Sequence, residues 1–107
     1  MLYLKWKDSE KQGYVFDPAK PIRIGRSPEK NDICIRKETV SLQHCVLYLY
    51  QTGVFLEDLH SRNGTWLKQG LVKRQVRGAE PVFSGDKIIV GDLVIKVIIF
   101  TFDMAYV

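Results

Sequence analysis

Cysteine and histidine are scarce in this 107-residue sequence, which has two of each. No CxxC pair is present, and the two histidines lie too far apart to show a metal-ligand spacing, so we expect no metal site and no cofactor. Cys34 and Cys45 both occur in alternating apolar segments. Because cysteine most often behaves as a small buried hydrophobe, we predict two core thiols, with a disulfide left open. Thiols of this kind fit a reducing compartment.

The sequence also has little in the way of long hydrophobic runs. Its N-terminus, MLYLKWKDSEK, has no apolar stretch of the kind found in a signal peptide. The one long run, LVIKVIIFTF, is interrupted by Lys96 and is too short to cross a bilayer. We therefore expect a cytoplasmic protein with no membrane segment in this chain.

Sustained helical periodicity is missing too, since no segment of ten or more residues repeats its apolar positions every 3.6 residues. Instead, the chain has short runs rich in β-branched and aromatic residues, many of them alternating apolar with polar side chains. Turn sequences such as SPEKND, SRNG, RGAEP and SGD separate these runs. The ten runs span residues 2–6, 14–16, 21–25, 32–36, 45–50, 54–58, 65–68, 71–76, 86–90 and 93–100. This pattern predicts an all-β sandwich or barrel, and the length predicts one domain over residues 1–107.

The charge is mildly basic, with a net charge of +4 and basic residues gathered in residues 23–37 and 68–77. Two interpretations are open: a solvated basic surface, or a surface that binds an anionic partner. Composition alone does not separate a nucleic acid from a phosphoprotein. The basic residues are interleaved with acidic ones, and no nucleic-acid-binding motif is present, so we expect no nucleic-acid partner.

Ser41, His44 and Asp58 raise the possibility of a catalytic triad, which needs a base in contact with the nucleophile and a third group orienting that base. Ser41 and His44 are three residues apart at the entrance to a predicted strand, where they would point to opposite faces. The G-x-S-x-G turn that presents a nucleophilic serine is absent. We therefore expect no enzyme.

Three polar loops favour binding instead: residues 25–27, 39–44 and 61–65. If they meet at one end of a sandwich, they form a joint site, as antibody loops do. Arg26 would offer a planar fork that matches phosphate oxygens, and Ser41 a short neutral donor. The Asn63 amide could pair with the backbone of an extended peptide.

Four sequence blocks, GRS at 25–27, NDIxI at 31–35, VSxxH at 40–44 and SxNGT at 61–65, resemble the forkhead-associated (FHA) domain in order and spacing. The resemblance extends from about Leu2 to Phe102. It implies a two-sheet sandwich of ten to eleven mostly antiparallel strands, whose loops at one end bind a phosphothreonine-containing peptide or protein. It also implies a phosphorylation-dependent signalling module within a larger protein.

Carried over residue by residue, the resemblance implies that Arg26 and Ser41 contact the phosphate and that Asn63 holds the peptide backbone. It gives a loop-shaping role to four further residues, Gly25, His44, Gly64 and Thr65. One departure is Leu42, because the family commonly has Arg, Lys or Asn directly after the serine. Two neighbours have open roles: Arg62 is either a compensating phosphate ligand or a solvated residue, and Thr39 either donates to the phosphate or completes a turn. The alternative to phosphate binding is an FHA-like scaffold or self-association domain with a weakened phosphate site.

Overall fold

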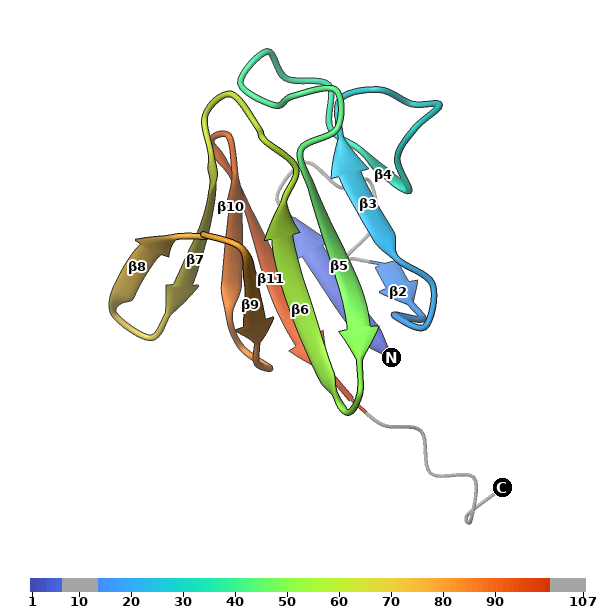
Figure 1. Ribbon diagram of the computed structural model, residues 1–107, viewed down its shortest axis with the longest axis vertical. Coiled ribbons are helices and arrows are strands. Elements are labelled where there is room, and N and C mark those ends of the chain that lie inside the picture. Colours follow the sequence, from blue (N-terminus) through green and yellow to red (C-terminus); the bar gives the residue numbers. More distant parts are fainter. Residues whose placement is uncertain (7–13, 101–107) are drawn as a thin grey trace.

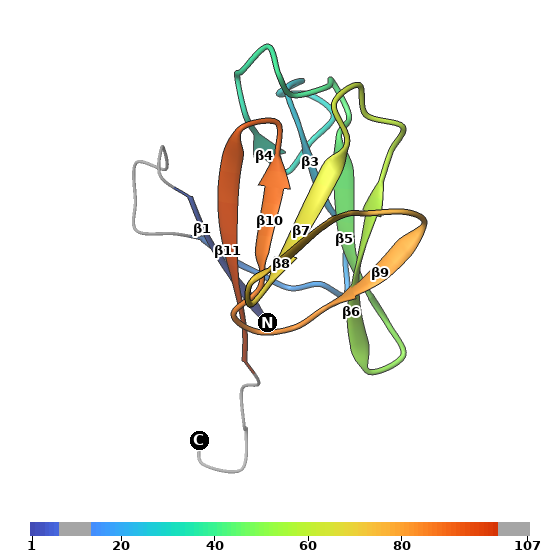
Figure 2. The ribbon, with the colours of Figure 1, turned by 90° about the vertical axis from the view of Figure 1, so that its left-hand side faces the viewer.

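Two β-sheets face each other in the computed structural model, which describes residues 1–6 and 14–100 (Figures 1 and 2). The six-stranded sheet has the spatial order β2 (Tyr14–Phe16), β1 (Leu2–Trp6), β11 (Leu93–Ile99), β10 (Lys87–Val90), β7 (Thr65–Gln69) and β8 (Val72–Gln75). The five-stranded sheet has the order β4 (Ile33–Cys34), β3 (Ile22–Gly25), β5 (Cys45–Tyr50), β6 (Gly53–Asp58) and β9 (Ala79–Val82). Neighbouring strands are antiparallel except for the parallel pair β3 and β4. The predicted all-β sandwich is confirmed, and none of the described residues forms a helix that could cross a membrane.

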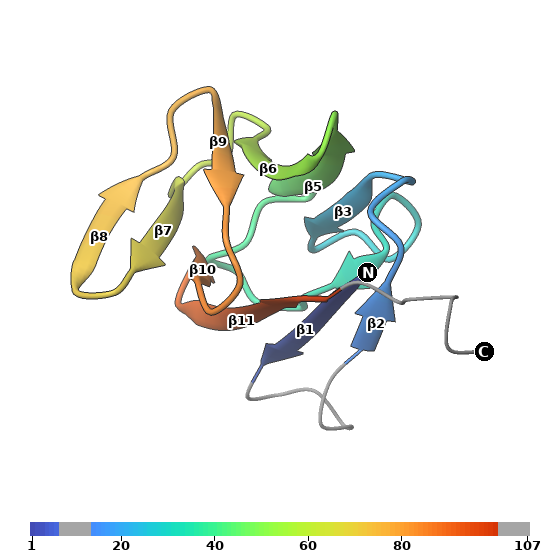
Figure 3. The same cartoon turned by 90° about the horizontal axis from the view of Figure 1, so that it is seen from below.

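The core lies between the two sheets because apolar residues alternate along most strands. In β11, Leu93, Ile95 and Val97 are buried, whereas Val94 and Lys96 face outward. Alternate side chains of a strand point to opposite faces, so one face of each sheet contributes to a shared apolar layer. Figure 3 shows this arrangement along the strands, with β5, β6 and β3 above β10, β11 and β1.

The sequence pattern did not predict strand β9. Its first three residues belong to the segment RGAEP, which we predicted to be a turn, yet Ala79–Val82 pairs with β6 in register from Glu57 to Val54. Pro81 lacks a backbone donor and is tolerated because β9 is the last strand of its sheet. The pairing with β6 therefore overrides a local sequence that is typical of a turn.

The two cysteines differ in environment. Cys45 is buried at the start of β5, and burial raises the pKa of its thiol to about 12. Cys34 is exposed, and its Sγ lies 3.4 Å from the carbonyl oxygen of Arg26. Both thiols are free. The prediction of two core thiols is thus wrong for Cys34, because the short edge strand β4 turns this side chain outward.

Four connections lie at the same end of the sandwich, at the top of Figure 1. They join β3 to β4, β4 to β5, β6 to β7, and β10 to β11. The three polar loops singled out by sequence are the first three of these. The fold therefore brings together residues from Gly25 to Asp92 that are far apart along the chain.

Candidate ligand-binding site

His44 is fully buried and ties three parts of the loop end together. Its Nδ1 accepts a hydrogen bond from the Ser41 backbone N–H at 3.0 Å, and its Nε2 lies 2.9 Å from the Gly64 carbonyl oxygen. Because the first partner can only donate and the second can only accept, the ring is neutral with its proton on Nε2. Its own backbone N–H donates to Ile24 of β3 at 2.9 Å. His44 thus fixes the β4–β5 and β6–β7 loops against β3.

The Ser41 hydroxyl is held by the β6–β7 loop and is not part of a triad. Its hydroxyl oxygen accepts a hydrogen bond from the Arg62 backbone N–H at 2.9 Å, which leaves the hydroxyl proton available. The imidazole contacts the Ser41 backbone N–H, and the Asp58 carboxylate binds Ser61 and Thr65. Ser41, His44 and Asp58 therefore do not form a nucleophile–base–acid chain. The Ser41 backbone N–H is occupied by the His44 Nδ1.

Arg26 is exposed directly after β3, and one edge of its guanidinium group is hydrogen-bonded. Its Nε donates to the Val40 carbonyl oxygen at 3.0 Å, and its backbone N–H donates to the Ser41 carbonyl oxygen at 2.9 Å. Within the described residues, Nη1 and Nη2 have no hydrogen-bond or ion-pair partner. The fork is therefore oriented beside Ser41, with two terminal nitrogens left for an anion.

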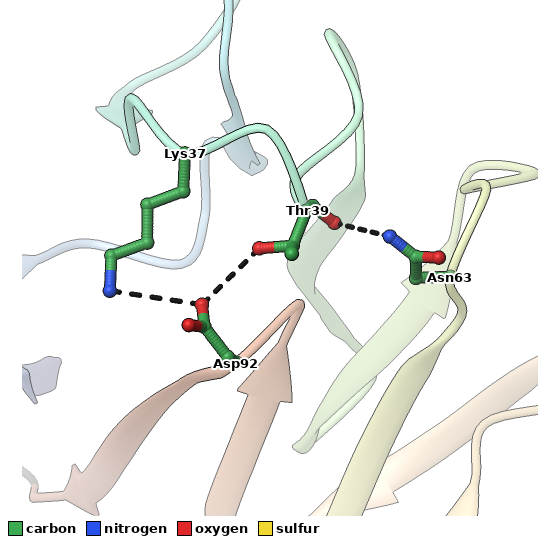
Figure 4. Close-up of polar contacts among 4 residues, drawn as sticks. All are labelled: Lys37, Thr39, Asn63 and Asp92. Carbon is green, nitrogen blue, oxygen red and sulfur yellow. Dashed lines mark hydrogen bonds and ion pairs between the residues drawn. The ribbon is translucent and has the colours of Figure 1, made fainter.

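Asn63 and Thr39 form the other side of the site. The Asn63 Nδ2 donates to the Thr39 carbonyl oxygen at 2.9 Å, which turns the amide oxygen of this exposed residue away from the loop. The Thr39 hydroxyl donates to the Asp92 carboxylate at 3.2 Å (Figure 4). Since a hydroxyl has one proton, the structure places Thr39 as a link between loops, with its donor directed away from Ser41.

Asn31 is a loop-shaping residue that sequence reasoning missed. Its Nδ2 donates to the carbonyl oxygens of Ser27 and Leu42, each at 2.7 Å, and so joins the β3–β4 and β4–β5 loops. Gly25 lies next to this contact, and an added Cβ would clash with the Leu42 carbonyl oxygen. Gly25 therefore serves close approach, whereas Gly64 serves its backbone conformation, with φ of 80°. Asn31 is the first residue of the NDIxI block, and its place in that block was the sequence signal that could have identified it.

Asp58, the last residue of β6, holds the β6–β7 loop through hydrogen bonds. Its carboxylate accepts hydrogen bonds from the Ser61 backbone N–H at 3.0 Å and from the buried Thr65 hydroxyl at 2.6 Å. Burial raises the pKa of this carboxyl, but the hydrogen bonds from Ser61 and Thr65 outweigh burial, so the net pKa is lowered. Thr65 thereby anchors the loop that presents Arg62 and Asn63.

The lowered pKa of Asp58 predicts a specific acid sensitivity. Its stabilising contribution is complete above the ordinary value of 3.8 and is lost as the pH falls through the lower pKa of the folded state. Urea unfolding should show that the stability difference between wild type and Asp58→Asn is largest above about pH 5 and shrinks as the pH falls below the ordinary pKa. A difference that stays constant down to the acid limit would contradict this assignment.

Leu42 is the departure from the family pattern, and Arg62 is the residue considered as a compensating phosphate ligand. The Leu42 side chain is 52% exposed and has no polar group for an anion. The Arg62 side chain is exposed, and within the described part of the chain it has no hydrogen-bond or ion-pair partner. Because the Arg62 backbone N–H contacts the Ser41 hydroxyl, the Arg62 side chain leaves the main chain next to that serine. Among the described residues, no cluster of three or more His, Cys, Asp or Glu side chains could hold a metal ion.

The loop end thus combines an oriented guanidinium, a free hydroxyl proton and an outward amide on an all-β sandwich. The model of the FHA domain family matches residues 22–91, and the chain belongs to this family. A search of curated proteins gave no match.

Several solved structures share the fold. The FHA domain of the CT664 protein from Chlamydia trachomatis has a TM-score of 0.81 at 19% identity, over 94% of this chain and 98% of that one. Mycobacterium tuberculosis EmbR, solved in complex with a low-affinity phosphopeptide, has a TM-score of 0.79 at 29% identity. That match covers 95% of this chain but 25% of EmbR. The MEK1 FHA domain, solved with a HOP1 phosphothreonine peptide, has a TM-score of 0.74 at 16% identity, over 94% and 97% of the two chains.

Proposed function

We propose that the loop end binds phosphothreonine-containing peptides and so mediates phosphorylation-dependent protein association, as a module of a larger protein. The observation that carries the proposal is the placement of Arg26 beside Ser41. The two terminal guanidinium nitrogens and the serine hydroxyl proton are unpaired within the described residues, and both side chains are fixed by loop contacts. A phosphate brings about −1.5 to −2 charges and three acceptor oxygens, which these donors complement. Asn63 would then bind the peptide backbone through its amide oxygen.

The test is a titration of a diverse phosphothreonine peptide library, its unphosphorylated counterpart and its phosphoserine version. We expect micromolar binding that requires the phosphate and that is stronger for phosphothreonine than for phosphoserine. Equal binding of phosphorylated and unphosphorylated peptides would contradict the proposal.

The exposed Leu42 side chain supports a second candidate, a phosphate-independent scaffold domain. In that case Arg26 would be expected to take part in an internal ion pair. Instead its guanidinium lies at the surface, and its one side-chain hydrogen bond among the described residues goes to a carbonyl oxygen. The phosphate-binding proposal is therefore favoured.

Leu42→Arg is expected to strengthen phosphopeptide binding by about tenfold to a hundredfold. A hydrogen bond to a charged group contributes about 1.5–3 kcal/mol, and every 1.4 kcal/mol changes affinity tenfold. Anisotropy titrations of both proteins with the same peptide measure the gain, and Leu42→Met is the control that keeps the side chain apolar. If Leu42→Arg binds no more tightly than Leu42→Met, position 42 lies outside reach of the phosphate.

A further inference from the structure

The fourth connection at the loop end, the β10–β11 turn, contributes an acidic side chain beside the proposed peptide site. Asp92 accepts the Thr39 hydroxyl hydrogen bond at 3.2 Å, and Thr39 in turn accepts the Asn63 amide hydrogen bond at 2.9 Å (Figure 4). Gly91 has φ of 62°, and an added Cβ would come within 2.6 Å of the Thr39 hydroxyl oxygen. This close packing fixes the position of the turn against the β4–β5 loop.

We propose that Asp92 is a specificity-determining residue, which selects peptides with a lysine or arginine near the phosphothreonine; this proposal rests on the proposed function. Arg26 and Arg62 lie at the Ser41 side of the site, whereas Asp92 lies beyond Thr39. The site therefore has a positive side and an acidic side. A ligand with a phosphate at one position and a basic side chain a few residues away would match both.

The separation between the two sides fits an extended peptide. The α-carbons of Ser41 and Thr39 are at most about 7 Å apart, since each residue spans no more than 3.6 Å or so. The Asp92 carboxylate lies a further 3.2 Å from the Thr39 hydroxyl. An extended peptide advances about 3.3 Å per residue, so a side chain within about four positions of the phosphothreonine is in range of Asp92.

The internal contacts of Asp92 leave it able to bind a second cation. Lys37 Nζ lies 3.7 Å from its Oδ1, which is beyond hydrogen-bond distance, and the Asp92 side chain is 66% exposed. Thr39 and Lys37 both contact Oδ1, so Oδ2 has no partner among the described residues. An exposed ion pair of this kind is weak and readily rearranged.

The experiment uses an alanine-flanked phosphothreonine peptide with single Lys, Ala or Glu substitutions at each of four positions on either side. We expect wild type to bind the Lys peptide about threefold to tenfold more tightly than the Glu peptide at one or two of these positions. The preference should shrink as salt is added, because exposed charges are screened. Equal affinities for Lys and Glu at all positions, or a preference for Glu, would overturn the proposal while leaving phosphate-dependent binding intact.

Two variants assign the preference to Asp92. Asp92→Asn keeps an acceptor for the Thr39 hydroxyl but removes the charge, and it should reduce the Lys-over-Glu ratio to less than about twofold. Asp17→Asn is the matched control at the opposite end of the sandwich, where Asp17 accepts a hydrogen bond from the Ala19 backbone N–H; it should keep the wild-type ratio. A preference that persists in Asp92→Asn would overturn the role of Asp92. Absence of phosphate-dependent binding for every peptide would instead refute the proposed function itself, and this inference with it.

Discussion

Arg26→Ala is expected to weaken phosphothreonine-peptide binding by about a hundredfold or more. The substitution removes two terminal guanidinium donors, and a hydrogen bond to a charged group contributes about 1.5–3 kcal/mol, where 1.4 kcal/mol is tenfold in affinity. The Nε bond to the Val40 carbonyl oxygen holds the fork in place before the ligand arrives, so little ordering is needed on binding. Isothermal titration with wild type and variant measures the loss directly.

Arg26→Lys and Arg36→Ala are the controls for this result. Lysine keeps the charge but loses the planar fork, so Arg26→Lys should bind with intermediate affinity. Arg36 is exposed in the same loop region and has no contact with Ser41 or Asn63 among the described residues, so Arg36→Ala should stay close to wild type. Comparable losses for Arg26→Ala and Arg36→Ala would indicate a diffuse charge effect and contradict a specific phosphate contact.

Much of the fold was predictable because it depends on local patterns. Short runs of β-branched and aromatic residues, many of them alternating with polar residues, identified ten of the strands. In β11, Ile95 and Val97 face the core and Lys96 faces solvent. β9 was missed because its residues favour a turn, and only the pairing with β6 makes them a strand. The exposure of Cys34 was missed for a related reason. A strand of two residues at the sheet edge has an inner and an outer side that its own sequence does not distinguish.

The site, too, was only partly predictable from the sequence. Motif spacing identified the residues that face outward, Arg26, Ser41 and Asn63, and the buried His44. Spacing could not identify the contacts that orient them, because these join loops distant in sequence. Thr39 and Asp92 are 53 positions apart, and Asn31 reaches Leu42 across 11 positions. Such partners emerge only when the strand order places the β10–β11 turn beside the β4–β5 loop.

His44→Ala is expected to lower the free energy of unfolding by about 3–5 kcal/mol, the largest stability change predicted for a single residue of the site. The substitution leaves a cavity at a fully buried position. It also removes the hydrogen-bond partner of two backbone groups, the Ser41 N–H and the Gly64 carbonyl oxygen. Each unpaired buried group costs about 1–3 kcal/mol. Urea unfolding followed by tryptophan fluorescence gives the change, and His60→Asn, at the exposed histidine with φ of 56°, should be nearly neutral.

Two shorter replacements of His44 separate its two hydrogen bonds. His44→Asn retains an acceptor near Nδ1 for the Ser41 N–H, whereas His44→Gln retains a donor near Nε2 for the Gly64 carbonyl oxygen. If the imidazole acts by holding Ser41, His44→Asn should keep more phosphopeptide affinity than His44→Gln at equal folded fraction. If it acts by holding the β6–β7 loop, the order reverses, because Arg62 and Asn63 follow the position of Gly64. Equal affinity for both variants and wild type would show that the histidine stabilises the fold without positioning the site.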